Sequence, residues 1–153
     1  MAKFRGVSHL SLDAKGRIVL PARHREHLPG LCNNQLIVTI DTDQPCLLIY
    51  PLPEWELIEE KIESLPSFNA TTRRIQRLLI GHATEIEVDA SGRMLLPTPL
   101  RDYARLEKKV MLVGQGKKLE LWDERLWSES MAVWLDSEGS DDEMPVALAE
   151  LTL

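Results

Sequence analysis

The sequence lacks the long apolar runs and the cysteine motifs that are typical of membrane and secreted proteins. No apolar run among its 153 residues is long enough to span a bilayer. The opening segment, MAKFRGVSHLSLDAK, has no apolar stretch of the kind found in secretory signals. Cys32 and Cys46 stand apart without CxxC spacing, which suits a reducing compartment. We therefore expect a cytoplasmic protein.

A catalytic set is also missing. The chain contains neither of the common glycine-rich phosphate loops. Ser8, His9 and Ser11 alternate along an expected strand, so no base is oriented toward a nucleophile. His24 and His27 have suitable atoms for zinc, but their spacing from the two cysteines matches no compact ligand motif. We expect no enzymatic activity, no bound metal and no cofactor.

The chain does not carry the net positive charge that is usual for a nucleic-acid-binding protein. Its formal charge is −6 at pH 7. The charges are unevenly distributed, however. Residues 1–27 hold six Lys and Arg against two acids, a net charge of +4, whereas residues 123–153 hold nine acids against one Arg, a net charge of −8. An anionic partner therefore remains possible if it meets the basic N-terminal segment.

What the sequence does contain is an internal repeat. The segment DAKGRIVLPARHR (13–25) matches DASGRMLLPTPLR (89–101) at seven of thirteen positions, with an offset of 76 residues. The similarity continues more loosely at an offset of 72, where CLLIY and then Trp55 correspond to LELW and then Trp127. Two copies of one unit of roughly 45–50 residues are the simplest explanation. We place these units at residues 7–54 and 83–126.

Each unit is predicted to consist mainly of strands. Strands at 7–12 and 17–20, and again at 85–88 and 93–96, flank the repeated turn as a hairpin. In each turn an aspartate (Asp13, Asp89) can accept backbone N–H bonds, and a glycine (Gly16, Gly92) can supply a left-handed conformation. A proline then opens a short helix, at 21–28 and 99–106. A second hairpin, closed by DTDQP or GQG, completes each unit.

The segments outside the two units are predicted to be helical or acidic. Apolar residues recur at helical spacing within 53–65, and Asn69 can cap a second helix that runs to Gly81, so residues 55–82 form a linking helical pair. The second helix carries three arginines that we expect to form ion pairs with the glutamates of the first: Arg73, Arg74 and Arg77. Residues 127–153 comprise a C-terminal helix and an acidic tail, in which 137–143 (SEGSDDE) reads as a mobile linker. The four tryptophans indicate core or subunit contacts.

Two interpretations fit the arginine that follows glycine in each turn. Arg17 and Arg93 can pair with Asp13 and Asp89 across their own hairpins, in which case the repeat is structural. Alternatively, each turn presents a guanidinium whose planar fork matches phosphate oxygens, or guanine O6 and N7 in a major groove. A surface ion pair contributes little stability, so it does not explain why arginine occurs in both copies. The residues alone leave both interpretations open.

Other basic residues near the first turn in sequence are candidates for phosphate contacts: Lys3, Arg5, Lys15, Arg23 and Arg25. Lys15 stands at the tip of the first turn, where the second turn has Ser91. We therefore expect the second turn to make the weaker contact.

Several motifs together resemble the MraZ family of bacterial transcriptional regulators. They are FRG (4–6), the two DxxxR turns, CLLIYPLPEW (46–55), RRIQRLLIGHA (73–83) and VMLVGQ (110–115). The resemblance extends over nearly the whole chain, to about Trp127, and the combination is specific, whereas a single DxxxR would be weak.

The resemblance implies a fold, an assembly and an activity. The fold would be α+β and mainly β, with two AbrB/SpoVT-like units that form swapped-hairpin β-barrel halves and pair within one chain as a pseudo-dimer. The chain would assemble into a ring-like homo-oligomer in the cytoplasm, associated with the nucleoid. It would bind tandem short G-rich repeats in double-stranded promoter DNA of its own division and cell wall gene cluster, usually as a repressor. The DNA-contacting arginine maps onto Arg17 and Arg93, with the first copy favoured.

Two other classes of function are weighed against DNA binding. An oligomeric protein-interaction module of the antitoxin type would use the same small fold. An enzyme built on a related barrel is disfavoured because the chain has no suitable acid, base or ligand set. The basic N-terminal segment and the doubled turn arginine favour the DNA-binding regulator.

Overall fold

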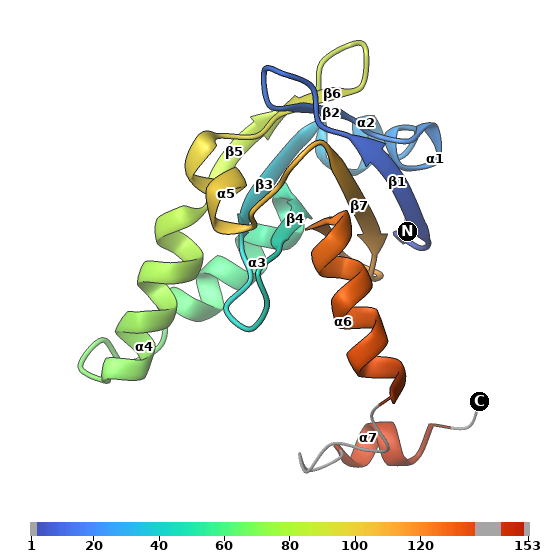
Figure 1. Cartoon of the computed structure of the whole chain (residues 1–153). Coiled ribbons are helices and arrows are strands. Elements are labelled where there is room, and N and C mark those ends of the chain that lie inside the picture. Colours follow the sequence, from blue (N-terminus) through green and yellow to red (C-terminus); the bar gives the residue numbers. More distant parts are fainter. Residues whose placement is uncertain (1–2, 137–144, 152–153) are drawn as a thin grey trace.

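The computed structural model describes residues 3–136 and 145–151, and it contains a six-stranded antiparallel sheet and a separate two-stranded ribbon (Figure 1). The sheet has the strand order β1-β7-β8-β4-β3-β5, and the ribbon pairs β2 with β6. The strands are β1 (Val7–Ser11), β2 (Arg17–Val19), β3 (Gln35–Ile40), β4 (Leu47–Pro51), β5 (Thr84–Glu87), β6 (Arg93–Leu95), β7 (Lys109–Gly114) and β8 (Leu119–Asp123). The helices are α1 (Ala22–Arg25), α2 (Leu28–Cys32), α3 (Leu52–Glu63), α4 (Ala70–Ile75), the π-helical η1 (Gln76–Ile80), α5 (Thr98–Tyr103), α6 (Glu124–Asp136) and α7 (Val146–Ala149).

The two predicted units exchange strands with each other. The first strand of each unit pairs with the third strand of the other: β1 with β7, and β5 with β3. The remaining strand pairings between units join equivalent strands, β2 with β6 and β4 with β8. Neither unit's first strand could therefore find its observed partner without the other unit.

The pairing registers follow the repeat seen in the sequence. Ile18 lies opposite Met94 at the centre of the ribbon, an offset of 76 residues. Leu48 lies opposite Glu120 at the centre of the β4–β8 pair, an offset of 72. Both pairs lie where a pseudo-twofold axis would relate the units, and both offsets match those read from the sequence. Leu36 and Val110 are equivalent, an offset of 74, so two residues of the difference accumulate before the second hairpins and two within them.

The predicted α+β fold with an antiparallel sheet is confirmed, but the sheet is not a closed barrel. Its edge strands, β1 and β5, lie at opposite ends of the strand order in the described residues. The barrel expected from the family resemblance is therefore wrong for the six-stranded sheet. The boundaries of the two units stay a prediction.

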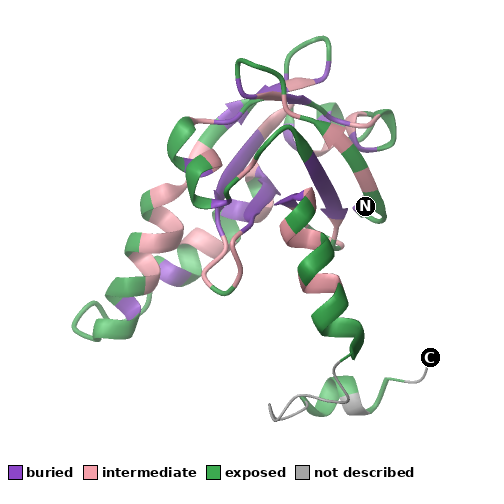
Figure 2. Ribbon diagram, in the orientation of Figure 1, coloured by how far each residue is buried: buried purple, intermediate pink, exposed green. Residues whose placement is uncertain are grey.

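A single hydrophobic core joins the two units beneath the ribbon. Ile18 and Met94 are fully buried, and they pack with residues from β3, β4, β7 and β8. The ribbon's alternate residues face outward, because successive side chains of a strand point to opposite faces. The sheet's central strands are buried on both faces, with Trp55 of α3 packed on one cluster and Trp122 of β8 in another (Figure 2). The core therefore supports the ribbon from below.

The local helix signals are largely confirmed. Asn69 caps α4, since its Oδ1 accepts hydrogen bonds from the N–H groups of Thr71 and Thr72 at 2.8 and 3.3 Å. The helix continues through η1 to Ile80, close to the expected end at Gly81. The helix expected at 21–28 is instead two short helices, α1 and α2, and the one expected at 99–106 is α5 at 98–103.

The predicted ion pairs between the two linking helices are wrong. In the described residues, none of the three arginines of α4 and η1 lies within ion-pair distance of an acid. The helices are joined through apolar side chains instead, with Trp55 packed near Leu79 and Ile80. Glu59, one of the expected partners, accepts a hydrogen bond from the Trp55 indole at 2.8 Å. Exposed long side chains gain little by pairing, so the apolar contact determines the geometry.

The C-terminal part of the described chain is built around tryptophan. Trp122, Trp127 and Trp134 pack edge to face with ring centroids 5.5–5.7 Å apart, which attaches α6 to the sheet. The acidic segment predicted to be a mobile linker, 137–143, lies outside the described residues. No described helix has the length and apolar character needed to cross a membrane.

The shared core predicts a sharp contrast between two neighbouring positions of β6. Met94→Ala should lower the free energy of unfolding by about 2–5 kcal/mol, because it leaves a cavity in the core of both units. Leu95→Ala, at an outward position that is 55% exposed, should change it by less than about 0.5 kcal/mol. Urea denaturation of both variants measures the difference. Equal losses would contradict the burial of one ribbon face.

Candidate nucleic-acid interface

The two repeated turns stand side by side at one end of the molecule, at the top of Figure 1, because β2 pairs with β6. In the first turn, Oδ1 of Asp13 accepts hydrogen bonds from the N–H groups of Lys15 and Arg17, both at 2.9 Å. The N–H of Gly16 donates to the carbonyl of Asp13 at 3.0 Å, and Gly16 has a φ of 85°. A glycine is favoured there because side-chain-bearing residues rarely adopt that conformation.

The second turn reproduces this geometry. Oδ1 of Asp89 accepts from the N–H groups of Ser91 and Arg93 at 2.9 Å each. Gly92 has a φ of 79°, and its N–H donates to the Asp89 carbonyl at 2.9 Å. The predicted structural roles of aspartate and glycine are therefore met in both copies, including the one that has serine at its tip.

The turn arginines pair with their own aspartates through one edge of the guanidinium. Nε of Arg17 lies 2.8 Å from Oδ2 of Asp13, and Nε of Arg93 lies 3.0 Å from Oδ2 of Asp89. Within the described residues, the terminal nitrogens of both guanidinium groups make no hydrogen bond. The ion pair of the structural interpretation thus exists, and it leaves the outer edge of each guanidinium available to a ligand.

Hydrogen bonds lower the pKa of both turn aspartates. For Asp13 the largest cause is the backbone N–H of Arg17, and the Arg17 side chain contributes further in the same direction. Asp89 is lowered in the same way by the backbone and side chain of Arg93. Because the folded-state pKa is depressed, both carboxylates stay ionised at neutral pH, and their contribution to turn stability is lost as the pH falls through that pKa.

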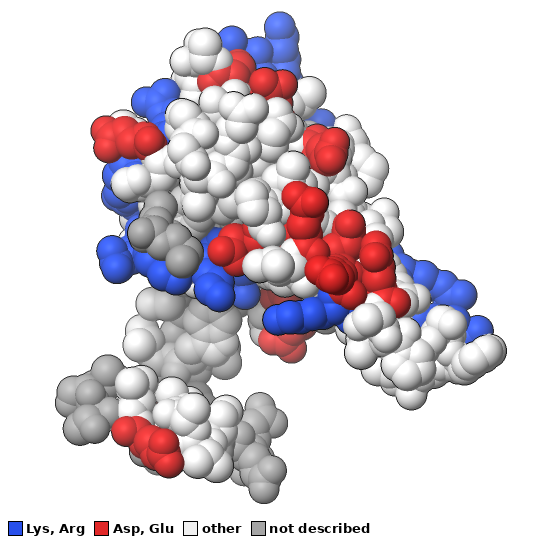
Figure 3. All heavy atoms as spheres, turned by 180° about the vertical axis from the view of Figure 1, so that it is seen from behind, with Lys and Arg blue, Asp and Glu red and all other residues white. Residues whose placement is uncertain are grey.

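The two guanidinium groups occupy the same face of the ribbon. Arg17 lies opposite Leu95 and Arg93 lies opposite Val19, so the arginines are diagonal neighbours, about 7–8 Å apart at the backbone. Val19 and Leu95 complete this outward face and are about half exposed. The ribbon therefore presents two cations and two apolar side chains to one ligand. Lys and Arg side chains are also visible at this end from behind (Figure 3).

The structure places some of the other basic candidates at the turns and the others along or beyond β1. Lys15 is exposed at the tip of the first turn, and Arg25 reaches the second turn, where its Nη1 donates to the carbonyl of Ser91 at 3.0 Å. Arg23 donates to the hydroxyl of Ser8 on β1. Lys3 and Arg5 lie beyond the far end of β1, next to the β7–β8 turn, because Phe4 pairs with Gly116. Since β1 alone spans about 17 Å, these two residues are remote from the turns.

Sequence reasoning missed Arg101. Its guanidinium packs against Gly16 of the first turn, and its Nε donates to the carbonyl of Leu96 at 2.9 Å. The repeat contained a signal for this residue, because Arg101 is the counterpart of Arg25 in the aligned thirteen-residue segments. The repeat alone does not show that each arginine lies at the turn of the opposite unit, because that depends on how the two units pair.

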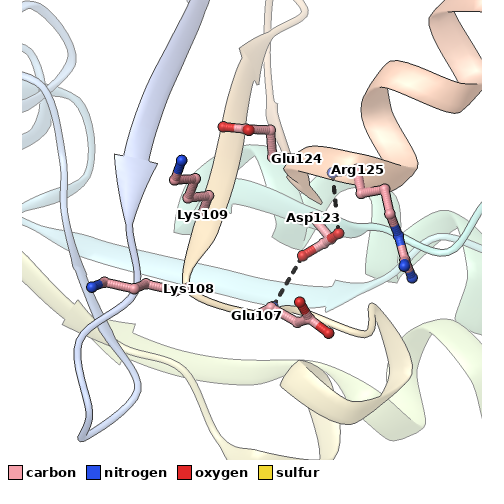
Figure 4. Close-up of a pocket in the computed structure, with 6 residues that line it drawn as sticks. All are labelled: Glu107, Lys108, Lys109, Asp123, Glu124 and Arg125. Atoms are coloured by element: carbon pink, nitrogen blue, oxygen red, sulfur yellow. Dashed lines mark hydrogen bonds between the residues drawn. The ribbon is translucent and has the colours of Figure 1, made fainter.

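Charged side chains also line a depression between β7 and the start of α6 (Figure 4). Asp123 is buried there, and it accepts hydrogen bonds from the backbone N–H groups of Glu107 at 3.0 Å and Arg125 at 3.2 Å. Its carboxylate therefore fixes the start of α6. The lysines in this view, Lys108 and Lys109, point away from that carboxylate. The arrangement explains local structure and does not place an acid and a base around a common point.

The cysteines and histidines considered for zinc do not come together. His24 is buried against the ring of Phe4, and Cys32 donates to the carbonyl of Leu28. Cys46 instead lies near two carboxylates, those of Asp41 and Glu120. Burial, followed by these carboxylates, raises the pKa of Cys46, so its thiol keeps its proton at neutral pH.

Comparison with known proteins gives a consistent result over the whole chain. A family model described as "MraZ protein, putative antitoxin-like" matches residues 3–78 and again 79–143. Proteins called "Transcriptional regulator MraZ" from Alkalilimnicola ehrlichii and Coxiella burnetii are 54% identical over 150 and 151 residues. A protein of the same description from Legionella pneumophila is 50% identical over 151 residues. Each alignment covers 98% of this chain and 99% of the relative.

The hydrogen bonds of the first turn predict how its carboxylate titrates. In Arg17→Ala the pKa of Asp13 should rise but stay below its ordinary value, because the backbone N–H of residue 17 is the largest cause of the shift. Carbon-detected NMR titration of the Asp13 carboxyl measures this. Arg93→Ala is the matched control and should leave the pKa of Asp13 unchanged. A return of Asp13 to its ordinary pKa in Arg17→Ala would contradict the backbone assignment.

Proposed function

Because the chain belongs to the MraZ family, we propose that it regulates transcription by binding promoter DNA through the two DxxxR turns. MraZ relatives are transcriptional regulators and not enzymes, which confirms the expectation that this chain is no enzyme. The observation that carries the proposal is the pair of guanidinium groups, from Arg17 and Arg93, on one outward face. Each is held in place by an aspartate and keeps its outer edge available.

This geometry suits the major groove of DNA. A groove about 12 Å wide admits a two-stranded ribbon, and a guanidinium can bond to O6 and N7 of one guanine. Arginines about 7–8 Å apart can reach bases separated by roughly two base pairs, given a rise of about 3.4 Å per pair. We therefore propose that the ribbon reads short G-rich repeats in the promoter of the chain's own division and cell wall gene cluster, and that binding represses this promoter.

The two turns are proposed to contribute unequally. Lys15 adds a cation at the tip of the first turn, where it can form an ion pair with a phosphate, whereas the equivalent Ser91 offers only an uncharged hydroxyl. Arg25 reaches the second turn and extends its positive surface, whereas Arg23, whose guanidinium lies at Ser8 and Gly6, would need a different part of the DNA path, as would Lys3 and Arg5. Helix α6 runs away from the turns (Figure 1), so its C-terminal part is remote from a duplex bound there, while Glu124 at its start lies 3.7 Å from His9 of β1.

We further propose that the chain acts as a ring-like homo-oligomer of AbrB/SpoVT-like units. The exchange of first strands between units supports a swapped arrangement within the chain. A single chain offers few suitable cations, and affinity grows with the number of phosphates neutralised. Repeating the turn pair around an assembly would raise affinity for tandem sites through effective concentration. Exposed apolar side chains far from the turns, Phe68 and Val133, are candidates for subunit contacts.

A second candidate function is protein interaction of the antitoxin type. The description of the matching family model, "putative antitoxin-like", favours it. In that case the turns would be structural, and the exposed apolar residues would bind a protein partner. A toxin-like neighbouring gene would support this candidate, whereas short G-rich repeats upstream of the gene would support DNA regulation.

The decisive variant is Arg17→Ala, tested by gel shift with the DNA upstream of the gene. Losing a bidentate arginine–guanine contact should weaken specific binding by about five- to 150-fold, because such a contact contributes about 1–3 kcal/mol. Arg93→Ala should lose less. Arg125→Ala, an exposed arginine on α6, is the matched control and should bind like the wild type.

The structure of the variants must be checked alongside their binding. Circular dichroism and size-exclusion chromatography should show that Arg17→Ala folds and assembles normally, since the Arg17 side chain is 30% exposed and lies outside the core. Undiminished specific binding by a folded Arg17→Ala protein would reject the proposed site.

A further inference from the structure

Each turn is covered by an arginine that belongs to the other unit. Arg25 closes α1 in the first unit and lies over Gly92 of the second turn. Arg101 occupies the equivalent position in α5 of the second unit and lies over Gly16 of the first turn. The contact is therefore reciprocal across the pseudo-twofold axis.

The contact between Arg25 and the second turn is direct. Nη1 of Arg25 donates to the carbonyl of Ser91 at 3.0 Å. A methyl group added at Gly92 would lie 2.2 Å from Cδ and 2.3 Å from Nη1 of Arg25, distances that no real carbon tolerates. The arginine thus fills the space that a side chain at residue 92 would need.

The contact between Arg101 and the first turn is similar in shape but differs in its hydrogen bonds. A methyl group at Gly16 would lie 2.7 Å from Cζ and 2.8 Å from Nε of Arg101. Arg101 donates to its own unit, from Nε to the Leu96 carbonyl and from Nη2 to the Thr98 hydroxyl, both at 2.9 Å. The first turn is therefore covered by Arg101, whereas the second turn is hydrogen bonded to Arg25.

Backbone bonds reinforce the same crossing. The N–H of Leu20 donates to the carbonyl of Gly92 at 2.9 Å, and the N–H of Leu96 donates to the carbonyl of Gly16 at 2.8 Å. Each turn glycine is thus held by a backbone N–H and an arginine side chain from the opposite unit. This crossing adds a second reason for glycine at both positions besides its positive φ.

We infer that Arg25 and Arg101 are positioning residues, and that each holds the DNA-reading turn of the opposite unit in its binding geometry. The inference rests on the proposed function as far as it concerns DNA. It assigns Arg25 to the second turn, although Arg25 follows the first turn in sequence. It also predicts that the two turns are held with unequal strength. Among the described contacts of these two arginines, only Arg25 donates a hydrogen bond to a turn carbonyl.

The first test measures the turns without DNA. Amide hydrogen exchange is compared for the wild type, Arg25→Met, Arg25→Lys and the control Arg23→Met, which alters an arginine bonded to Ser8 of its own unit. Arg25→Met should accelerate exchange at Ser91, Gly92 and Arg93 by about three- to tenfold, the ratio that corresponds to one ordinary hydrogen bond. The first turn should be unaffected. Arg25→Lys, which keeps a donor, should restore part of the protection.

Several outcomes of this test would overturn the inference. Acceleration in the first turn, equal acceleration in both turns, or no acceleration in the second would each show that Arg25 does not hold the opposite turn. An equal effect of Arg23→Met on the second turn would show that the disturbance is not specific to Arg25.

The second test is a double-mutant cycle in affinity for the upstream DNA. If Arg25 acts through the second turn, Arg25→Met and Arg93→Ala should be non-additive, with the double variant binding about as weakly as Arg93→Ala alone. Arg25→Met and Arg17→Ala should be additive. Additivity in both cycles would instead identify Arg25 as an independent phosphate contact. If the wild type showed no specific binding, the proposed function would fail while the exchange experiment still decided the positioning role.

Discussion

The pairing of β2 with β6 is the contact on which the rest of the structure depends. It places Ile18 opposite Met94 at the centre of an antiparallel ribbon, with one face in the core and the other in solvent. Since side chains alternate along a strand, burying these two residues forces Arg17 and Arg93 outward. The same pairing brings the two turns side by side and lets each turn glycine accept a hydrogen bond from the opposite unit. One register therefore determines the core, the turn geometry and the spacing of the two guanidinium groups.

Much of this architecture could be predicted from local sequence signals. The doubled DxxxR segment predicted two equivalent hairpin turns, and Asn69 predicted the start of a helix, because both signals act over a few residues. The exchange of strands could not be predicted from spacing, because an isolated hairpin pattern does not say which strand will lie beside it. The position of Arg101 over Gly16 depends on that exchange and was missed for the same reason. The ion pairs predicted for Arg73, Arg74 and Arg77 failed because apolar packing, and not charge, orients the two linking helices.

Positive charges are present at the ribbon end of the molecule, although the net charge of the chain is negative. A formal charge of −6 would repel DNA if it were evenly spread, yet the ribbon end presents arginines and a tip lysine. The turn aspartates leave part of each arginine available for DNA. Each carboxylate accepts backbone hydrogen bonds and contacts its arginine only at Nε. Their negative charge orients the arginine, and the outer nitrogens keep the geometry that guanine or phosphate requires. An aspartate beside a DNA-binding arginine is thus compatible with binding.

The most direct test of the central claim is to observe the arginine side chains while operator DNA is added. In NMR spectra of the Nε–Hε groups, we expect the signals of Arg17 and Arg93 to shift together at the same DNA concentration. The signals of Arg73, Arg74 and Arg77, on the linking helices far from the ribbon, should keep the chemical shifts of the free protein. Shifts confined to those three arginines, with Arg17 and Arg93 unchanged, would contradict the assignment of DNA recognition to the paired turns.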